Sequence, residues 1–562
     1  MNGKNVIEKD VQDLLISSTT ILLEALKQLE ETRERILICV DQDQRLLGVI
    51  SDGDVRRALI QGAELNDPID RWMQKDPVFV NDQCKVEEVM RFVSDRIRVV
   101  PIVNEQHRVV KYHSFKEKKG LTDSQLETVA VVGMGYVGLT LAVSLVDVGF
   151  KVIGFDVNKT LLESLNRSEA PFYEKGLQKY LDLFAGRNLT FTNVLPEHQA
   201  DVYMIAVGTP VDKTTKKPNL DHLLAAAASV GQSLKTGDLV VLRSTVPVGC
   251  TRKNVIPILE AKSGLSAGKD FYVAFAPERT IEGKALQELR VNPQIIGGYE
   301  SKAAELAARL FNYITKSVIN VGSLEAAEIC KLIDNSYRDH KFAFVNQLAG
   351  LCEQMDLDLN QLIEALNHGY SRNFIPRPSP GVGGPCLSKD PYILMNVFEE
   401  YGIDPVVIKS ARAVNESGPE GVYKTLNRLL KKIDKKIETA RLFLIGFAFK
   451  GFPETSDTRD STSVAFLNML PNKSNVKGFD PVLSSGEIKN LGIQPVSSFA
   501  EGFKQADAVV ILNNHPSYQD INIFQLCPTM RTPAAFIDTW HIFDPLDIKR
   551  IKGIVYGGIG NV

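Results

Sequence analysis

Residues 128–158 read TVAVVGMGYVGLTLAVSLVDVGFKVIGFDVN, and this stretch decides the fold of the largest part of the chain. A short apolar run leads into the glycine-rich segment 133–138, a longer apolar stretch follows, and a second apolar run ends at Asp156. The order predicts a strand, a tight turn, a helix and a second strand. Such a unit opens a parallel sheet that helices cover on both faces.

The segment 133–138 fits the pattern GxGxxG, in which each glycine has its own task. Gly133 permits the tight turn, Gly135 lets the backbone approach a pyrophosphate, and Gly138 lets the helix pack closely on the strand. Tyr136 and Val137 begin the helix, whose N-terminal N–H groups favour a phosphate. The pattern therefore predicts a dinucleotide site, and the alternative is a tight turn that binds nothing.

Asp156 favours NAD as the dinucleotide. It lies 23 residues beyond Gly133 and ends the second apolar run, close to the spacing of about 20 expected of a ribose-binding acid. A carboxylate there accepts hydrogen bonds from a ribose diol, and its charge repels a 2′-phosphate. The sequence therefore predicts NAD rather than NADP.

Composition excludes several classes of protein. The chain has 562 residues, of which 44% are hydrophobic and 24% charged, with a net charge of −3. These values are ordinary for a globular protein and argue against broad electrostatic binding to nucleic acid or an anionic membrane. No apolar run reaches the about 18–20 residues of a membrane helix, and no secretory signal is visible. Seven scattered cysteines with no CxxC pair predict a reduced, cytoplasmic protein without a zinc site.

The remaining pattern predicts four folded parts. Further buried strands are expected at 201–210, 238–247 and 271–279, a helical region follows from 323 to about 434, and strands return at 441–451, 476–481, 506–516 and 534–540. We predict an α/β protein with two Rossmann-like domains joined by a central helical region and preceded by an α+β module. The expected boundaries are 1–115 for the module, 116–127 for a linker, 128–320 for the NAD domain, 321–434 for the helical region and 435–562 for the last domain.

The N-terminal module contains an internal repeat. A helix at 21–31, two strands within 35–51 and a helix at 54–60 are followed by a weaker copy with a helix at 85–95 and strands within 97–114. With the segment GVISDGD (48–54), the repeat resembles a tandem CBS pair. The resemblance implies that Ser51 and Asp54 contact the ribose of an adenine or uridine nucleotide effector. The second copy lacks the acidic position, which predicts one site at most, and the alternative is a module that only assists dimerisation.

The segment PGVGGPCLSKDP (380–391) is a candidate catalytic loop. Its glycines let the backbone pass close to a ligand, and Cys386 has Lys389 nearby, which favours a reactive thiolate. The alternative is a structural cysteine. Lys331 and Asn335 share a helix face with Glu328, which predicts either a cleft or a solvated surface. Pro277-Glu278-Arg279 ends a predicted strand, where ligands commonly bind, or forms a simple surface turn.

Seven motifs in this order resemble the UDP-glucose/GDP-mannose dehydrogenase family over residues 128–562. They are VVGMGYVGL, VGTP (207–210), STVPVGCT (244–251), PER (277–279), AEICKLIDNSYRDHKFAFVN, GVGGPCLSKDP and GFAFKGFPETSDTRDSTS (446–463). The resemblance implies an NAD-dependent enzyme that oxidises the C6 hydroxyl of a nucleotide sugar to a carboxylate, with two NAD consumed. It also implies a homodimer or higher homo-oligomer, built on the central region.

The resemblance assigns roles to individual residues. Cys386 would trap the aldehyde as a thiohemiacetal, Lys331 would stabilise oxyanions, and Asn335 would hold the C6 oxygen. Asp390, Glu278 and Thr245 would surround the water that hydrolyses the thioester. The substrate-binding residues implied are Glu278, Arg338, Arg372, Gly383, Lys450 and Arg459, and Thr209 and Thr245 join the cofactor-binding residues.

The motif PERTIEG (277–283) favours one branch of the family. It resembles the UDP-N-acetylhexosamine dehydrogenases, which act on UDP-GlcNAc or UDP-ManNAc in the supply of surface polysaccharide precursors. Lys389-Asp390 instead resembles the UDP-glucose 6-dehydrogenases, which stay an alternative. Two other classes also stay open, namely a two-electron hydroxyacid dehydrogenase and a non-catalytic nucleotide-sensing scaffold.

Overall fold

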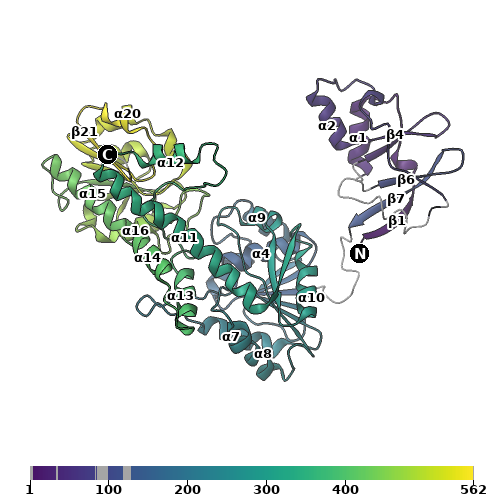
Figure 1. Cartoon of the computed structure of the whole chain (residues 1–562), viewed down its shortest axis with the longest axis horizontal. Helices are drawn as coiled ribbons and strands as arrows, with labels where there is room; N and C mark the ends of the chain where they lie inside the picture. Colours follow the sequence, from purple (N-terminus) through teal and green to yellow (C-terminus); the bar gives the residue numbers. More distant parts are fainter. Residues whose placement is uncertain (1–3, 33–35, 83, 85–98, 118–127, 561–562) are drawn as a thin grey trace. The chain divides into compact units, whose positions relative to one another are not determined.

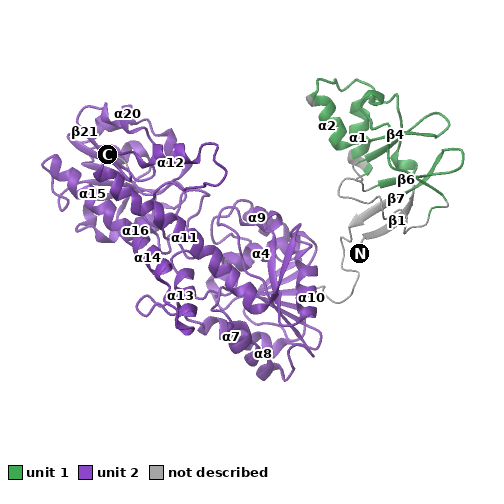
Figure 2. Ribbon diagram, in the orientation of Figure 1, with its two compact units in different colours: residues 1–124 green, residues 125–562 purple. Residues whose placement is uncertain are grey.

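The structure is a computed structural model that describes residues 4–32, 36–82, 84, 99–117 and 128–560 (Figure 1). The chain divides into two compact units, residues 1–124 and 125–562 (Figure 2). The helix predicted at 85–95 and most of the predicted linker 116–127 lie outside the described residues. In the described part of the chain, no helix has the length and apolarity to cross a membrane.

The first unit contains two small sheets. One has the order β2 (Leu15–Ser17), β3 (Ile36–Val40), β4 (Leu46–Ser51), and the other has the order β1 (Lys4–Asp10), β7 (Val109–Glu117), β6 (Val99–Val103), β5 (Val80–Asn81). Helix α1 (Leu22–Thr32) lies between β2 and β3 in the sequence, and helix α2 (Asp52–Ile60) follows β4. Strand β1, which pairs with β7 over seven residues, was not predicted because KNVIEKD alternates too weakly to signal a strand.

The second unit begins with an eight-stranded sheet. Its order is β10 (Leu189–Thr192), β9 (Lys151–Phe155), β8 (Thr128–Val132), β11 (Val202–Ile205), β12 (Leu239–Leu242), β13 (Tyr272–Phe275), β14 (Gln294–Gly298), β15 (Val318–Ser323). Every neighbouring pair is parallel except β13 with β14. All residues of β11 and β12 are buried, as expected of strands covered on both faces.

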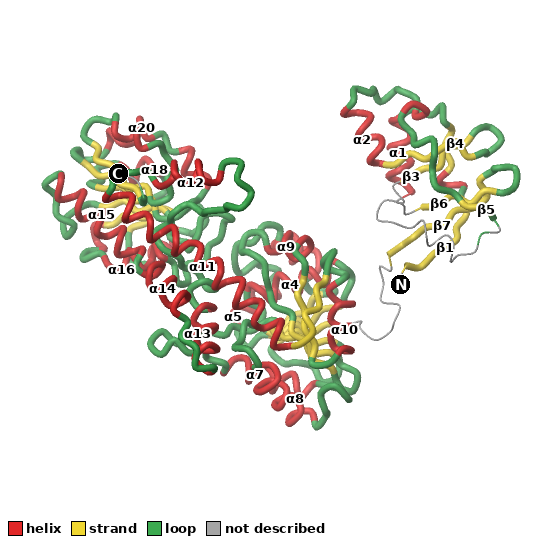
Figure 3. Tube along the Cα trace, in the orientation of Figure 1, coloured by secondary structure: helices red, strands yellow, loops and turns green. Residues whose placement is uncertain are grey.

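A 31-residue helix, α11 (Leu324–Gln354), follows this sheet and runs toward the second one (Figure 1). Helices α12 (Leu359–Asn367), α13 (Asp390–Glu400), α14 (Val406–Glu416) and α15 (Gly418–Lys432) complete the helical region. The last sheet is wholly parallel, in the order β18 (Gln494–Pro495), β17 (Val476–Phe479), β16 (Leu442–Ile445), β19 (Ala508–Ile511), β20 (Ala534–Asp538), β21 (Ile554–Gly558). Figure 3 shows helices around the eight-stranded and the six-stranded sheets of the second unit, so the predicted α/β class is confirmed.

Candidate active site

The glycine-rich loop joins β8 to α4 (Tyr136–Asp147). Gly133 has a φ of +97°, and a Cβ on Gly138 would lie 1.7 Å from the carbonyl oxygen of Gly133. A Cβ on Gly135 would meet no atom within 4 Å, and no side chain caps the first turn of α4. The loop therefore places the first turn of α4, which no side chain caps, beside open space, and this fits the pyrophosphate of a dinucleotide.

Asp156 and Tyr136 also stabilise this loop. The Asp156 carboxylate accepts hydrogen bonds from the backbone N–H of Met134 at 2.7 Å and of Asn158 at 2.9 Å. The Tyr136 hydroxyl donates a hydrogen bond to the Glu174 carboxylate, and burial raises the pKa of this tyrosine well above its usual range. The Tyr136 ring thus serves the fold, while its backbone and that of Val137 stay in the first turn of α4.

Two further predicted cofactor residues lie at neighbouring strand ends. Thr209 follows β11 and Thr245 follows β12, and the Thr209 hydroxyl donates to the carbonyl of Thr245 at 2.5 Å. Because β8, β11 and β12 are adjacent and parallel, both threonines lie at the same edge of the sheet as the glycine-rich loop.

The structure brings five of the six predicted catalytic side chains together from four segments, namely Lys331, Asn335, Glu278, Asp390 and Cys386. Lys331 and Asn335 project from α11, and they are 5% and 0% exposed. The Lys331 Nζ lies 3.8 Å from Glu278 Oε2, in the loop after β13. The Asn335 amide donates to the carboxylate of Asp390, the first residue of α13, which is 0% exposed.

Cys386 is half-buried in the loop before α13, four residues from Asp390. Burial raises the pKa of its thiol, Lys331 and Lys389 lower it, and Asp390 and Glu278 raise it. The Lys389 Nζ forms an ion pair with Asp390 Oδ1 at 2.6 Å, and its charge also lowers the pKa of the Cys386 thiol. The free thiol is therefore mostly protonated, and a cation is available to stabilise it once it ionises.

The predicted substrate residues fall into two groups. Arg338 Nη2 donates to Asn335 Oδ1 at 2.7 Å, so it belongs to the catalytic cluster. A Cβ on Gly383 would lie 2.2 Å from the carbonyl of Asp460, so this glycine lets the cysteine loop touch the segment 446–463. Arg372 is exposed after α12, with its guanidinium 5.9 Å from the Tyr370 ring centre. Within the described residues Arg372 forms no hydrogen bond or ion pair.

Lys450 and Arg459 connect the two α/β domains in this structure. The Lys450 Nζ donates to the carbonyls of Glu282 and Pro453, and burial lowers its pKa to about 8. Arg459 pairs with Asp457 and lies 3.6 Å from a Glu282 carboxylate oxygen. Burial, followed by repulsion from Asp457, raises the pKa of Glu282 to about 7. The sequence did not identify Glu282, because its role depends on contacts 168 residues away.

Glu328 serves the fold rather than a cleft. Its carboxylate accepts from the backbone N–H groups of Gly249 and Thr251 and from the Thr251 hydroxyl. It therefore satisfies the N–H groups at the start of the helical turn 251–255. Of the three residues predicted to share one face of α11, Glu328 is structural, and Lys331 and Asn335 belong to the catalytic cluster.

Ser51 and Asp54 in the first unit bond to each other. Ser51 is the N-cap of α2, its hydroxyl donates to Asp54 Oδ2 at 2.6 Å, and the Asp54 carboxylate also accepts from the Ser51 N–H at 2.9 Å. Arg57 pairs with the other carboxylate oxygen. This capping box explains both residues without a ligand, and their contact with a nucleotide stays a prediction.

Comparison with known families gives four matches along the chain. The UDP-glucose/GDP-mannose dehydrogenase family matches with its NAD binding domain at residues 127–315, its central domain at 325–417 and its UDP binding domain at 443–545. A CBS domain matches residues 7–61. The single CBS match covers the first copy of the predicted repeat.

Individual proteins agree with the family matches. A UDP-N-acetyl-D-mannosamine dehydrogenase of Pyrococcus horikoshii is 33% identical over 436 residues, 77% of this chain and 99% of the relative. A solved structure of UDP-D-ManNAc dehydrogenase from the same organism has a TM-score of 0.69 at 31% identity and covers 77% of this chain and 99% of its own. A UDP-glucose dehydrogenase structure from Pyrobaculum islandicum has a TM-score of 0.67 at 26% identity, covering 79% and 100%.

These matches decide between the classes left open by the sequence. The three family domains occur in order, and the third is a UDP binding domain, which a hydroxyacid dehydrogenase does not need. The protein is an NAD-dependent nucleotide-sugar dehydrogenase with an N-terminal CBS domain. Sequence, fold and site geometry thus agree that the chain belongs to the UDP-glucose/GDP-mannose dehydrogenase family.

Proposed function

We propose that the enzyme oxidises the C6 hydroxyl of a UDP-N-acetylhexosamine to the uronic acid through a covalent intermediate on Cys386. The observation that carries this proposal is the convergence of Lys331, Asn335 and Asp390 beside the cysteine loop. An ordinary two-electron alcohol dehydrogenase needs no thiol at the reacting carbon. A cysteine under the influence of two lysines suits the capture of an aldehyde.

NAD, held by the loop 133–138 and Asp156, would supply the hydride acceptor, and the four-electron oxidation of C6 would consume two NAD per sugar. Between the two oxidations, the Cys386 sulfur bonds to the aldehyde carbon and the carbonyl oxygen becomes the hydroxyl of a thiohemiacetal. Lys331 stabilises the oxyanion as it forms, and Asn335 holds the oxygen in place. Oxidation of the thiohemiacetal leaves a thioester. Water then cleaves its carbon–sulfur bond, with Asp390, Glu278 and Thr245 placed around that water, and the thiol is restored.

The choice of sugar rests on sequence rather than on overall shape. Structures from both sugar classes superimpose with TM-scores of 0.69 and 0.67, so the fold is common to them. The relative at 33% identity is named for UDP-N-acetyl-D-mannosamine, and the segment PERTIEG points to the same branch. We therefore place UDP-ManNAc and UDP-GlcNAc first, with UDP-glucose as the alternative. Arg338, Arg372, Gly383, Lys450 and Arg459 are proposed to contact this substrate.

A panel experiment tests the proposal. The enzyme is incubated with NAD and, separately, with UDP-ManNAc, UDP-GlcNAc and UDP-glucose, and products are identified by mass. We expect a UDP-N-acetylhexosaminuronic acid and two NADH per sugar. One NADH per sugar would contradict the four-electron reaction, and turnover of UDP-glucose alone would contradict the substrate assignment.

Asp156 is proposed to select NAD by binding the adenosine ribose. Met134 and Asn158 donate to different carboxylate oxygens of Asp156, so Asp156→Asn removes the charge and keeps an acceptor oxygen for one of these two bonds. A hydrogen bond to a charged group contributes about 1.5–3 kcal/mol, so we expect the KM for NAD to rise roughly tenfold or more and the preference over NADP to shrink. Asp147→Ala, at the other end of α4, is the control. An unchanged NAD/NADP ratio would show that the ribose lies elsewhere.

We propose that the CBS domain is regulatory and binds a nucleotide at Ser51 and Asp54. The dehydrogenase unit, residues 125–562, is compact without it, so an added module is more useful as a sensor. Coupling between such a module and the enzyme is typically about 1–3 kcal/mol, or roughly a fivefold to hundredfold change in affinity.

Truncation near residue 121 measures this coupling. The truncated enzyme keeps the NAD and UDP binding domains, so nucleotides can also act on it there. We expect adenine or uridine nucleotides to change the activity or melting temperature of the full chain beyond any change in the truncated enzyme. If every nucleotide affects both proteins equally, the module assists assembly only.

The exposed face of α11 supports the proposed homodimer. Large apolar side chains with exposures of 51–60% recur along this helix and at the residue that caps its C-terminus, namely Ile333, Tyr337, Phe344, Leu351 and Met355. An apolar row of this length favours burial against a second copy. Light scattering should give at least twice the chain mass, and Phe344→Asp should lower it. A wild-type monomer would contradict the proposal.

A further inference from the structure

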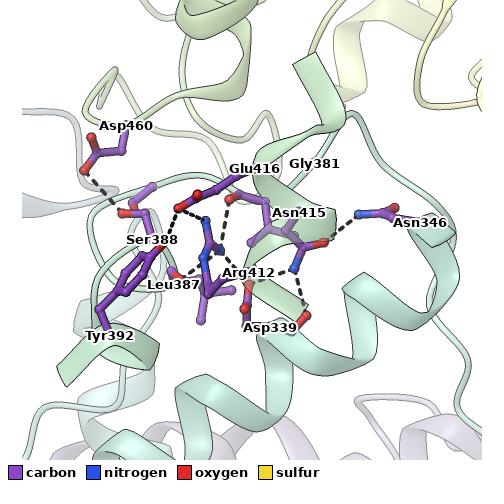
Figure 4. A network of polar contacts seen from close by, with 12 residues as sticks. Asp339, Asn346, Gly381, Leu387, Ser388, Tyr392, Arg412, Asn415, Glu416 and Asp460 are labelled. Atoms are coloured by element: carbon purple, nitrogen blue, oxygen red, sulfur yellow. Dashed lines mark hydrogen bonds and ion pairs between the residues drawn. The ribbon is translucent and has the colours of Figure 1, made fainter. Parts of the chain in front are cut away.

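A buried pair of opposite charges supports the segment that carries Cys386. Asp339 on α11 is 0% exposed and Arg412 on α14 is 2% exposed, and Arg412 Nη1 donates to Asp339 Oδ1 at 2.7 Å (Figure 4). The same nitrogen donates to the carbonyl of Leu387 at 3.2 Å and, more weakly, to that of Val382 at 3.5 Å. These two carbonyls stand on either side of Cys386 in the sequence, so one guanidinium fixes both flanks of the thiol.

A second arm of the network fixes the start of the same loop. Asn415 on α14 donates from Nδ2 to Asp339 Oδ1 at 2.8 Å and to the Asp339 carbonyl at 2.9 Å. Its own amide oxygen accepts from Asn346, whose oxygen accepts from the Ser379 N–H at 2.8 Å. The carbonyl of Asn415 accepts a long, 3.4 Å bond from the Val382 N–H. Helices α11 and α14 therefore hold the loop through one shared carboxylate (Figure 4).

The placement of Asp339 connects this network to the reacting groups. Lys331, Asn335 and Asp339 follow one another at intervals of four residues on α11, so they lie on one face. The helix that presents the cation and the amide of the catalytic cluster thus also anchors the cysteine loop. A buried ion pair is a poor means of adding stability, because apolar side chains of similar volume often serve as well. The geometry that the pair imposes on the loop is a better reason for its presence.

We propose that Asp339 and Arg412 are positioning residues that hold the segment Val382–Leu387 so that the Cys386 sulfur meets the substrate carbon beside Lys331. This inference rests on the proposed role of Cys386 as the nucleophile. Both side chains are buried behind the loop and act through it. The planar guanidinium aims Nη1 at the Asp339 carboxylate and the two loop carbonyls, while Nη2 donates to Glu416 Oε1 at 3.2 Å and fixes that orientation. A lysine has a single nitrogen for all of these acceptors.

The test uses two variants in the full-length enzyme. Arg412→Lys keeps the charge and loses the fork, and the double variant Asp339→Asn/Arg412→Gln removes both buried charges together, so neither is left uncompensated. Lys409→Gln is the control, since Lys409 lies on the same helix in a half-exposed pair with Asp404. For each protein, kcat, the KM for the UDP-sugar, NAD binding, the melting temperature and the rate of Cys386 alkylation by iodoacetamide are measured, the last by peptide mass.

We expect both variants to lose about tenfold or more in kcat, while the KM and the NAD affinity change by less than about threefold. The alkylation rate of Cys386 should change with kcat, and the control should match the wild type in every measurement. A general loss of stability would instead lower the melting temperature and NAD affinity together, without a selective effect on the thiol.

Three results would overturn the proposal. One is wild-type kcat and Cys386 alkylation in folded variants. Another is a failure of both variants to fold, which would make the pair a stability element. The third is a loss that appears in KM rather than kcat. Alkylation needs neither substrate nor turnover, so it reports on the positioning pair even if Cys386 proves not to be the nucleophile.

Discussion

Cys386→Ser should abolish release of the uronic acid and leave the binding of NAD and UDP-sugar nearly intact. The serine hydroxyl is a far weaker nucleophile than a thiolate at neutral pH, and a thioester cannot form. Side chains that bind the sugar and the dinucleotide are unchanged by the substitution. We therefore expect no detectable uronic acid by mass, with dissociation constants for NAD and sugar within about threefold of the wild type.

A second cysteine provides the control. Cys330 is half-buried on α11, one residue before Lys331, and Cys330→Ser should retain turnover. Full activity of Cys386→Ser would contradict the covalent mechanism.

The charge of Lys331 lowers the pKa of the Cys386 thiol, so Lys331→Met should raise that pKa. At a fixed pH near 8 the alkylation of Cys386 should then be slower in the Lys331 variant than in the wild type.

The sequence predicted the fold best where local pattern and tertiary structure agree. Residues 128–158 form β8, the loop, α4 and β9 because the glycines, the apolar runs and the strand-ending Asp156 all favour the same unit. The motifs that meet in the catalytic cluster were also visible, because glycine-rich loops and strand ends carry their signal locally. Only the family resemblance implied that these motifs lie close together, and the structure gives the contacts between them.

Contacts between distant segments escaped the sequence. Arg412 and Asp339 are 73 residues apart and look like ordinary charges on two helices. Only their burial reveals that they form a pair. Glu282 was not predicted for the same reason, because its contacts with Lys450 and Arg459 join the two α/β domains. Strand β1 was missed because its pairing with β7 depends on a partner about 100 residues later, which period alone does not signal.

The same substitution at two glycines of the dinucleotide loop should have different effects on the stability of the free enzyme. A Cβ on Gly138 would lie 1.7 Å from the carbonyl oxygen and 2.9 Å from the carbonyl carbon of Gly133. Both atoms are backbone, so the turn itself must open. Overpacking of this kind costs about 1–3 kcal/mol or more, and at about 2–4 °C per kcal/mol for a domain of this size the melting temperature of Gly138→Ala should fall by several degrees. NAD binding should weaken with it.

Gly135→Ala should instead leave the free enzyme folded and remove NAD binding. A Cβ at this position meets no atom within 4 Å, so the melting temperature without NAD should stay within about 1–2 °C of the wild type. The same methyl group occupies the space through which the pyrophosphate approaches the N–H groups of α4, and we expect the NAD affinity to fall more than about tenfold.

Gly421→Ala, on α15 and equally free of contacts, is the control. Normal NAD binding by Gly135→Ala would show that this loop is not the phosphate site, and wild-type melting of Gly138→Ala would show that helix and turn do not pack as closely as described. Because one substitution affects the ligand and the other the fold, the pair separates the two tasks of the motif.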